Sequence, residues 1–575
     1  MMKKTDFSTL KKVMDYIGRN KFFLLLSIIL SSISVILTLY IPQLFGDAID
    51  LISENISSLD SISKILVKIG ILILITAALT WILNTVNNRI TYHIVADIRK
   101  EAFAHLQKLP LSYLDSKKSG DIVSRMIADV DQFADGLLMG LTQLFTGIVT
   151  IIVTLIFMIE RNIYITLLVA LLTPLSFGVA KFIADHTHDM FKKQSETRGR
   201  QTALIDEMIG NEKVVKAFGY EERAKERFEK LNNELENYSL RAVFFSSITN
   251  PSTRFVNSII YAAVAMAGAF LVIGNSLTVG GLSVLLSYAS QYTKPFNEIS
   301  SVITELQNAF VCAERIFELL EEKPQSEDPQ EKLIVTDGAV KIENVSFGYR
   351  PDRILISDLD LDVKPGMRVA IVGPTGCGKT TMINLLMRFY DVSGGKISVD
   401  DQDISEVNRG SLRAGFGMVL QDTWIRNASV RDNIRLAKPE AEDEEIIEAA
   451  KKARSYGFIR RLPQGLDTIL TEDTLSQGQK QLLCITRVML SLPPMLILDE
   501  ATSSIDTRTE VKIQEAFARM MEGRTSFIVA HRLSTIQSAD IILVMKDGHI
   551  IEKGNHQELL DKGGFYHDLY YSQFQ

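Results

Sequence analysis

The feature that most constrains this chain is a series of long apolar runs confined to its first half. The first run, Phe22–Ile41, carries no charged residue and ends before Pro42. About 20 such residues are needed for a helix to cross the hydrocarbon core of a bilayer. Comparable runs follow at 69–86, 137–159, 163–180, 255–273 and 280–293. The last run is interrupted by polar residues, which a helix interface or a wet cavity tolerates better than lipid does. The pattern predicts an all-α membrane domain with six membrane helices.

Basic residues set the expected orientation of these helices. Those that precede the first run are Lys3, Lys4, Lys11, Lys12, Arg19 and Lys21. Because basic loops stay in the cytoplasm, the N-terminus is expected there. The first run has spanning length and no small-residue cleavage pattern, which favours a retained helix over a signal peptide. The two long loops, 89–135 and 181–249, are then cytoplasmic, and their charged, helix-forming composition predicts membrane helices that extend below the bilayer.

Length and composition limit the remaining function classes. A chain of 575 residues needs at least two domains, and its average 46% hydrophobic and 23% charged content hides an apolar first half and a polar second half. The net charge of -7 argues against a nucleic-acid partner. The cysteines, Cys312, Cys377 and Cys484, form no CxxC pair, so they are expected to be reduced thiols rather than zinc ligands or disulfides.

The change in composition places the domain boundaries. Residues 1–322 hold the apolar runs, and the polar stretch 323–338 contains Pro324 and Pro329 and is typical of a linker. From 339 to 575, short β-rich runs at 368–372, 495–498, 526–530 and 541–545 alternate with helical patterns. This alternation predicts a domain built on a parallel α/β sheet.

The most specific motif follows the first of those core strands. It matches the phosphate-loop pattern GxxxxGK[ST] with Gly373, Pro374, Thr375, Gly376, Cys377, Gly378, Lys379 and Thr380. Glycines let backbone N–H groups close around phosphates, Lys379 brings positive charge to the β and γ groups, and Thr380 can ligate magnesium. With Thr381, which comes next, these residues are the predicted phosphate cradle.

Two carboxylates follow another apolar strand, Met495–Leu498. Asp499 is predicted to hold the magnesium shell, and Glu500 to polarise the water that attacks the γ-phosphate. A strand followed by acids is common in isolation, but its combination with the phosphate loop predicts an ATP-hydrolysing site. The expected cofactors are therefore ATP and Mg2+.

Further motifs extend a resemblance over the whole chain: it resembles a half-size ATP-binding-cassette exporter. The sequence from Leu475 is similar to the family signature LSGGQ, which implies that Ser476, Gly478 and Gln479 contact ATP held by the opposite subunit. The other residues implied by the resemblance are Tyr349 on adenine, Gln421 on magnesium and the attacking water, Asp506 in the loop that crosses the dimer interface, and His531 on the γ-phosphate. The implied fold is a six-helix membrane domain followed by an α/β P-loop ATPase domain.

The membrane half carries weaker signs of the same resemblance. Residues 109–125 and 214–221 are similar to the cytoplasmic loops that carry short coupling helices in these exporters. On local sequence alone, each stretch is equally well explained as a plain solvated helix.

Two departures from the family pattern shape the expected assembly. Gln477 stands where the consensus has glycine, and only Asp473 and Thr474 separate Glu472 from the signature. The phosphate loop, the two carboxylates and His531 match the family pattern, so the chain has the catalytic residues of one ATP site but an atypical signature for the other. This split predicts a heterodimer with a second half-transporter chain that carries an intact signature, with a homodimer as the alternative.

The predicted function is ATP-driven export of small amphipathic or hydrophobic molecules across the cytoplasmic membrane by alternating access, as in multidrug exporters. A lipid flippase of the same architecture shares every motif. A non-pumping channel or regulatory subunit is the alternative from another class, and Glu500 argues against it because such proteins have more often lost that carboxylate. The identity of the cargo does not follow from the sequence.

Overall fold

The computed structural model describes residues 4–53, 59–350, 352–421, 423–471, 473–499, 505–529 and 533–574. The chain divides into two compact units. One comprises Met1–Lys108 and Lys118–Lys323, and the other comprises Leu109–Lys117 and Pro324–Gln575. The division after Lys323 lies at the start of the stretch expected to be a linker.

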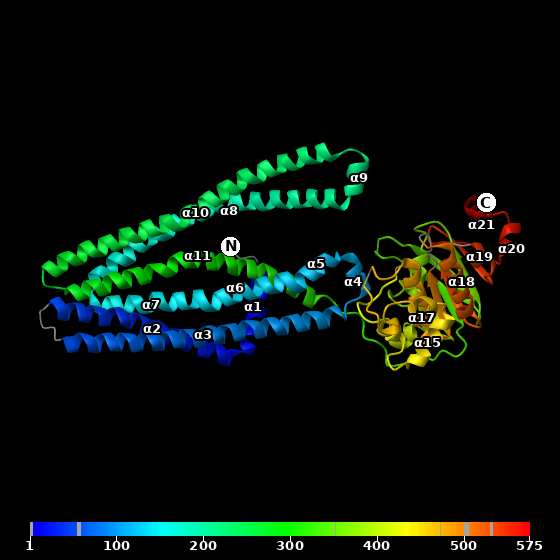
Figure 1. The fold of residues 1–575 in the computed structure, drawn as a ribbon, viewed down its shortest axis with the longest axis horizontal. Helices are drawn as coiled ribbons and strands as arrows, with labels where there is room; N and C mark the ends of the chain where they lie inside the picture. The colour runs from blue at the N-terminus through cyan, green and yellow to red at the C-terminus, as the bar shows by residue number, and fades with distance from the viewer. Residues whose placement is uncertain are drawn as a thin grey trace. The chain divides into compact units, whose positions relative to one another are not determined.

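The first unit is helical (Figure 1). Its α-helices are α1 (Lys4–Arg19), α2 (Lys21–Ser53), α3 (Leu59–Leu106), α5 (Ser119–Ser124), α6 (Val130–Met139), α7 (Phe145–Arg161), α8 (Ile163–Gly210), α9 (Glu212–Ala217), α10 (Glu221–Ile273) and α11 (Val279–Glu321). Two π-helical turns, η1 (Arg125–Asp129) and η2 (Gly140–Leu144), join α5, α6 and α7 into one continuous helical path.

Four described helical segments are long and apolar enough to cross a membrane: Lys21–Ser53, Asp60–Leu106, Ser119–Arg161 and Pro251–Ile273. The other two predicted spans lie in α8, where the apolar stretch found is the shorter Ile163–Leu175, and at the start of α11. The predicted span in α11 is the one interrupted by polar residues. Several of those residues pack inside the unit, among them Tyr288, which is buried and donates a hydrogen bond to the carbonyl oxygen of Leu39 over 2.9 Å.

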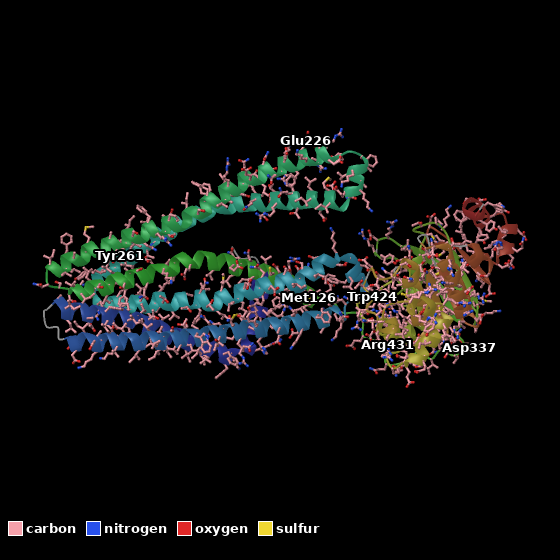
Figure 2. All side chains as sticks on the ribbon, viewed as in Figure 1. Met126, Glu226, Tyr261, Asp337, Trp424 and Arg431 are labelled. Carbon is pink, nitrogen blue, oxygen red and sulfur yellow. The ribbon has the colours of Figure 1, made fainter. Side chains whose placement is uncertain are left out.

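Several helices are much longer than a bilayer requires. The 53 residues of α10 extend over about 80 Å at 1.5 Å per residue, against a hydrocarbon core of about 30 Å. Helices α8 and α10 run side by side and are joined at one end by α9 (Figure 1). Figure 2 shows Glu226 near the α9 end of α10 and Tyr261 in its apolar part. The predicted helical extensions beyond the membrane are therefore present.

The second unit is an α/β domain. Its strands are β1 (Val340–Phe347), β2 (Ile356–Val363), β3 (Arg368–Val372), β4 (Gly394–Val399), β5 (Gln402–Asp403), β6 (Phe416–Val419), β7 (Met495–Asp499), β8 (Thr525–Val529), β9 (Ile541–Lys546) and β10 (His549–Gly554). Its α-helices are α4 (Leu111–Ser116), α12 (Lys379–Leu386), α13 (Arg409–Ala414), α14 (Val430–Ile434), α15 (Asp443–Lys452), α16 (Tyr456–Ile459), α17 (Gln477–Ser491), α18 (Thr507–Met521), α19 (Leu533–Gln537), α20 (His556–Asp561) and α21 (Phe565–Phe574).

Two sheets organise this domain. The larger has the order β10-β9-β3-β8-β7-β6, and all its neighbouring strands are parallel except β10 and β9. The strands β3, β7, β8 and β9 are fully buried or nearly so, as expected for a parallel sheet covered on both faces. The predicted parallel α/β sheet is confirmed. A second, antiparallel sheet with the order β2-β1-β4-β5 was not predicted.

The short helix α4 groups with this domain although its sequence lies between two helices of the first unit. Asp115 of α4 accepts a hydrogen bond from the hydroxyl group of Tyr390. Burial raises the pKa of Tyr390, and this hydrogen bond and the charge of Asp115 raise it further, so the phenol stays protonated as a donor. The first part of the stretch 109–125, which resembles a coupling-helix loop, therefore forms a helix that groups with the ATPase unit, whereas α5 in its second part belongs to the first unit.

Candidate functional site

The phosphate loop begins where β3 ends. Gly373, Gly376 and Gly378 all have positive φ values, of 151°, 84° and 108°. A Cβ atom on Gly373 would lie 2.2 Å from the carbonyl oxygen of Met545, whereas one on Gly376 would meet nothing within 4 Å. The first glycine is thus required by close packing against β9, and the second leaves open space on the exposed side of the loop. This is the kind of backbone cradle that can close around phosphates.

Lys379, the first residue of α12, bends back over the loop. Its Nζ atom donates hydrogen bonds to the carbonyl oxygens of Gly373 and Pro374, over 2.8 and 3.0 Å. The loop thus holds a buried cation at the N-terminus of a helix, and both the positive charge and the helix N-terminus favour anions. Thr380 is exposed at the same helix start, next to the buried Thr381. The remaining predicted loop residues divide into exposed Pro374 and Thr375 and buried Cys377.

Tyr349 lies beside this helix, after β1. Its hydroxyl group is 3.2 Å from the Oγ1 atom of Thr381 and accepts a hydrogen bond from Asn384 over 3.2 Å. Its ring makes edge contacts with Phe347 and Tyr390, each at 5.0 Å between centroids. Because the side chain is still 48% exposed, a π face supported by α12 is left accessible to a planar base.

The strand order brings the other predicted residues to the edge that carries the phosphate loop. Strands β3, β8, β7 and β6 are parallel neighbours, so their carboxyl ends meet at one edge of the sheet. Asp499 is the buried last residue of β7, and Gln421 is exposed two residues beyond β6. Glu500 and His531, which follow β7 and β8 in the sequence, lie outside the described residues. The topology nevertheless directs all four strand ends to the same edge.

Of the three predicted magnesium ligands, all of which lie in the described residues, Asp499 is the one that carries a carboxylate. No group of three or more His, Cys, Asp and Glu residues able to hold a metal is found among the described residues. The predicted set of Thr380, Gln421 and Asp499 supplies a hydroxyl, an amide and a carboxylate oxygen. Hard oxygen ligands of this kind, few in number and completed by water and phosphate, suit Mg2+.

The signature residues form the start of α17. Ser476 caps this helix and exchanges hydrogen bonds with Gln479: the backbone N–H of Ser476 donates to Oε1 over 3.0 Å, and Ser476 Oγ accepts from the N–H of Gln479 over 3.4 Å. Gln477 is exposed, in the first turn of the helix. In the approach to the signature helix, the backbone N–H of Thr471 donates to Oγ1 of Thr474 over 2.8 Å, and the two threonine hydroxyl groups are also 2.8 Å apart.

Gly478 and Asp506 come from neighbouring segments. A Cβ atom on Gly478 would lie 2.6 Å from Thr509 and 2.9 Å from Ile505, so the absence of a side chain lets α17 approach the start of α18. Asp506 caps α18 by accepting a hydrogen bond from the N–H of Thr509 over 3.0 Å. That backbone hydrogen bond is the main cause that holds the pKa of Asp506 below its usual value. The predicted interface loop thus packs on the signature helix.

Sequence reasoning missed a polar cluster that joins the segment after Gln421 to the signature helix. Arg487 of α17 donates to the carbonyl oxygens of Trp424 and Asn433 and to the Oδ1 atom of Asn433, each over 2.7 Å. Fully buried Asn433 bonds the backbone of Arg426 in both directions. Trp424 itself is exposed on this domain (Figure 2). An arginine within an otherwise amphipathic helix looks like a solvent-facing residue, so only the tertiary contacts reveal its role.

Comparisons with known proteins identify both units. Residues 24–296 match the family model of the ABC transporter transmembrane region, and residues 356–503 match the family model described as ABC transporter. An uncharacterised ABC transporter ATP-binding protein of Bacillus subtilis is 37% identical over all of this chain and 95% of its own length. A fatty acid ABC transporter ATP-binding/permease protein of Mycobacterium bovis is 40% identical over 87% of this chain and 79% of its own.

A solved structure supports the same assignment across the whole length. A bacterial Atm1-family ABC exporter with ATP bound superposes with a TM-score of 0.78 and 28% identity, covering 97% of this chain and 98% of that one. The fold class predicted from the sequence, a helical transmembrane domain followed by an ABC ATPase domain, is confirmed. The chain therefore belongs to the ATP-binding-cassette exporters, membrane proteins that bind and hydrolyse ATP on a cytoplasmic domain fused to their transmembrane helices.

Proposed function

We propose that this chain exports small amphipathic or hydrophobic molecules across the cytoplasmic membrane by alternating access, as one subunit of a dimer. The observation that carries the proposal is the convergence of the phosphate loop, Asp499 and Gln421 at one sheet edge, in a chain that also contains a membrane bundle. A membrane unit and an ATPase unit in one chain allow binding and hydrolysis of ATP to shift the membrane unit between two states.

Each residue of the site has a proposed role in hydrolysis. Lys379 and the loop N–H groups hold the phosphates, and Tyr349 stacks on adenine. Mg2+, held by Thr380, Gln421 and Asp499, would neutralise charge on the β and γ phosphates. Glu500 accepts a proton from the attacking water, and His531 orients Glu500 and contacts the γ-phosphate.

The assembly that we propose is a heterodimer with one competent and one impaired ATP site. Each site in such a dimer takes its phosphate loop from one chain and its signature from the other. Gln477 is exposed at the start of α17, where its side chain would face the ATP held by the partner. The partner would supply an unaltered signature to the site at Glu500. A homodimer is the alternative, since an exposed glutamine at this position need not block hydrolysis.

The two candidate functions, export of small molecules and flipping of lipids, differ in the cargo that is moved. The Mycobacterium bovis relative is named for fatty acids, which are amphipathic molecules of the class proposed here. A lipid flippase of the same architecture would use the same ATPase site. A non-pumping channel is disfavoured because the sequence keeps Glu500.

The test is ATP-dependent uptake into inside-out membrane vesicles that contain the chain and a candidate partner, namely a second half-transporter encoded by an adjacent gene. Three fluorescent cargoes are compared: a hydrophobic dye, a labelled fatty acid and a labelled phospholipid. ATP-dependent accumulation of the dye or fatty acid inside the vesicle supports export. Movement of the phospholipid alone indicates a flippase, and absence of any ATP-dependent movement would contradict the proposal.

A further inference from the structure

The membrane unit contains a half-open cavity of about 450 Å³ lined by residues of α2, α3, η2, α7 and α11. This volume is within the range of about 300–1,000 Å³ that small-molecule sites occupy. The wall combines apolar side chains such as Val35 and Leu83 with hydroxyl and amide groups such as Thr146, Asn84 and Gln143. It also contains two ionisable residues of α11, Lys294 and Glu298.

The predicted membrane runs place the cavity wall in the membrane-spanning part of the unit, with Lys294 and Glu298 directly after the predicted run 280–293. Lys294 is fifteen residues from the start of α11 at Val279, or about 22 Å along the helix. Thr150 lies eleven residues from the opposite end of α7 at Arg161, or about 16 Å. With the N-terminus in the cytoplasm, as the basic residues predict, both of those helix ends are expected at the outer side of the membrane, so the wall would occupy its middle and inner part. Charged groups at such a depth are costly and generally mark a cargo or ion pathway.

Several hydroxyl groups of this wall already form hydrogen bonds within the membrane unit. Ser34 bonds Thr80, and Thr38 and Thr142 donate to carbonyl oxygens one turn earlier in their own helices. Such back-bonds are the usual way to satisfy a hydroxyl group in a membrane helix. They leave the longer amide and charged side chains as the groups with reach into the cavity.

Lys294 and Glu298 are a loose pair. The Nζ atom of Lys294 is 4.0 Å from Oε1 of Glu298, and the two side chains are 75% and 49% exposed. Glu298, the less exposed of the two, takes part in a further interaction within the protein. Lys294 also lies one turn deeper in the membrane than Glu298. The ammonium group is therefore the charge that is best placed to meet a molecule in the cavity.

We propose that Lys294 makes this cavity selective for amphiphiles with an acidic head group, with the carboxylate of a fatty acid as the simplest case. The ammonium group would donate charge-assisted hydrogen bonds to the carboxylate, and Val35 and Leu83 would contact the start of the alkyl chain. This inference rests on the proposed function and specifies the class of its cargo.

The test is equilibrium binding of three twelve-carbon amphiphiles to the full transporter in lipid nanodiscs without nucleotide. Radiolabelled dodecanoate, dodecanol and dodecylamine share a chain and differ in head-group charge. The parent is compared with Lys294→Met, Lys294→Arg and Lys230→Met, the last an exposed lysine of α10 that does not line the cavity. Size-exclusion elution checks folding, and Lys294→Gln replaces Lys294→Met if that variant misassembles.

The parent is expected to bind dodecanoate more tightly than dodecanol or dodecylamine. Lys294→Met should weaken dodecanoate binding about tenfold or more, the effect of losing a hydrogen bond to a charged group, and change dodecanol binding by less than about twofold. Lys294→Arg and Lys230→Met should retain the preference for dodecanoate. Tighter binding of dodecylamine than of dodecanoate, unchanged dodecanoate binding in Lys294→Met, or equal loss of dodecanoate and dodecanol would overturn the proposal. Because the assay uses no ATP, these outcomes are distinct from a failure of ATP-driven export.

Discussion

Lys379 places a buried positive charge within hydrogen-bonding distance of the backbone of the phosphate loop. Its ammonium group is held over the loop by the carbonyl oxygens of Gly373 and Pro374. These two acceptors position a cation where phosphate oxygens are expected. We therefore expect Lys379 to contribute to nucleotide binding itself rather than to a later step.

Replacement of this side chain gives the residue-scale prediction. Lys379→Ala should weaken ATP binding about tenfold or more, because it removes a point charge that faces the β and γ phosphates. Lys364→Ala, in an exposed turn before β3, is the matched control and should bind ATP normally. An equilibrium titration with a fluorescent ATP analogue measures both. Equal affinities of the two variants would contradict the role of Lys379.

At the scale of secondary-structure elements, the signature helix is fixed to the loop after Gln421 by the cluster of Arg487 and Asn433. Burial lowers the pKa of Arg487, although its guanidinium group donates to three oxygen atoms. An arginine buried in this way stabilises the position of α17 relative to the loop at Trp424. Any movement of the loop is thereby linked to the helix that carries Ser476 and Gly478.

Removal of this linkage should affect stability and catalysis together. Arg487→Met keeps much of the side-chain volume but removes the donor to the carbonyl oxygens of Trp424 and Asn433 and one of two donors to Asn433 Oδ1, at a cost of about 1–3 kcal/mol. Hydrogen exchange should speed up at residues 424–433, and ATPase activity should fall. Arg519→Met, an exposed position of α18, is the control. Native exchange rates in Arg487→Met would refute the linkage.

A second element-scale prediction concerns Asp400, which fastens the end of the linker to the antiparallel sheet. Its carboxylate accepts hydrogen bonds from the backbone N–H groups of 336–339. Burial raises the pKa of Asp400, but these hydrogen bonds outweigh burial and hold the pKa below its usual value. A lowered folded-state pKa means that the carboxylate adds stability above the unfolded-state pKa of about 4, and that this stability is lost as the pH falls through the lower folded value.

The pH dependence follows with a defined sign. Asp400→Asn should be less stable than the parent at pH 7, and the difference should shrink below about pH 4 as the parent carboxylate is protonated. Thermal unfolding followed by circular dichroism at several pH values measures this. Asp401→Asn, the exposed neighbour, is the control. A stability difference that stays constant down to pH 2 would be inconsistent with the hydrogen-bonded carboxylate.

Local sequence patterns predicted those parts of the structure that depend on residues close together in the chain. The apolar run from Phe22, the phosphate loop and the buried strand before Asp499 each have a period or spacing that fixes their structure. The antiparallel sheet was missed because its pairs, such as Val340 with Val399, join distant segments. The Arg487 cluster and the cavity at Lys294 were missed for the same reason, since both depend on how distant elements pack.

At the scale of the whole molecule, the proposed assembly follows from assigning the signature and the catalytic residues of one chain to different ATP sites. The start of α17 and the phosphate loop of one chain belong to different ATP sites in the proposed dimer. An intact catalytic half with an altered signature therefore gives two unequal sites when paired with a different chain. The altered position is Gln477.

The whole-molecule prediction is that the chain is active with a second half-transporter rather than alone. Purification alone and together with the product of the neighbouring gene should give full cargo-stimulated ATPase activity only for a complex with one copy of each chain. Native mass spectrometry measures the stoichiometry. Gln477→Gly, which restores the consensus, should raise the activity of the chain alone. Full stimulated activity of a pure homodimer would exclude the heterodimer.

The most direct test of the central claim, that this chain's own site hydrolyses ATP to drive export, is the comparison of ATP binding and turnover in Glu500→Gln within the assembled complex. The glutamine keeps the shape of the side chain but cannot accept a proton from the attacking water. We expect ATP affinity within about twofold of the parent, together with loss of most hydrolysis and of ATP-dependent transport, since general-base catalysis contributes about a hundredfold or more. Hydrolysis and transport at the parent rate in Glu500→Gln would contradict the account.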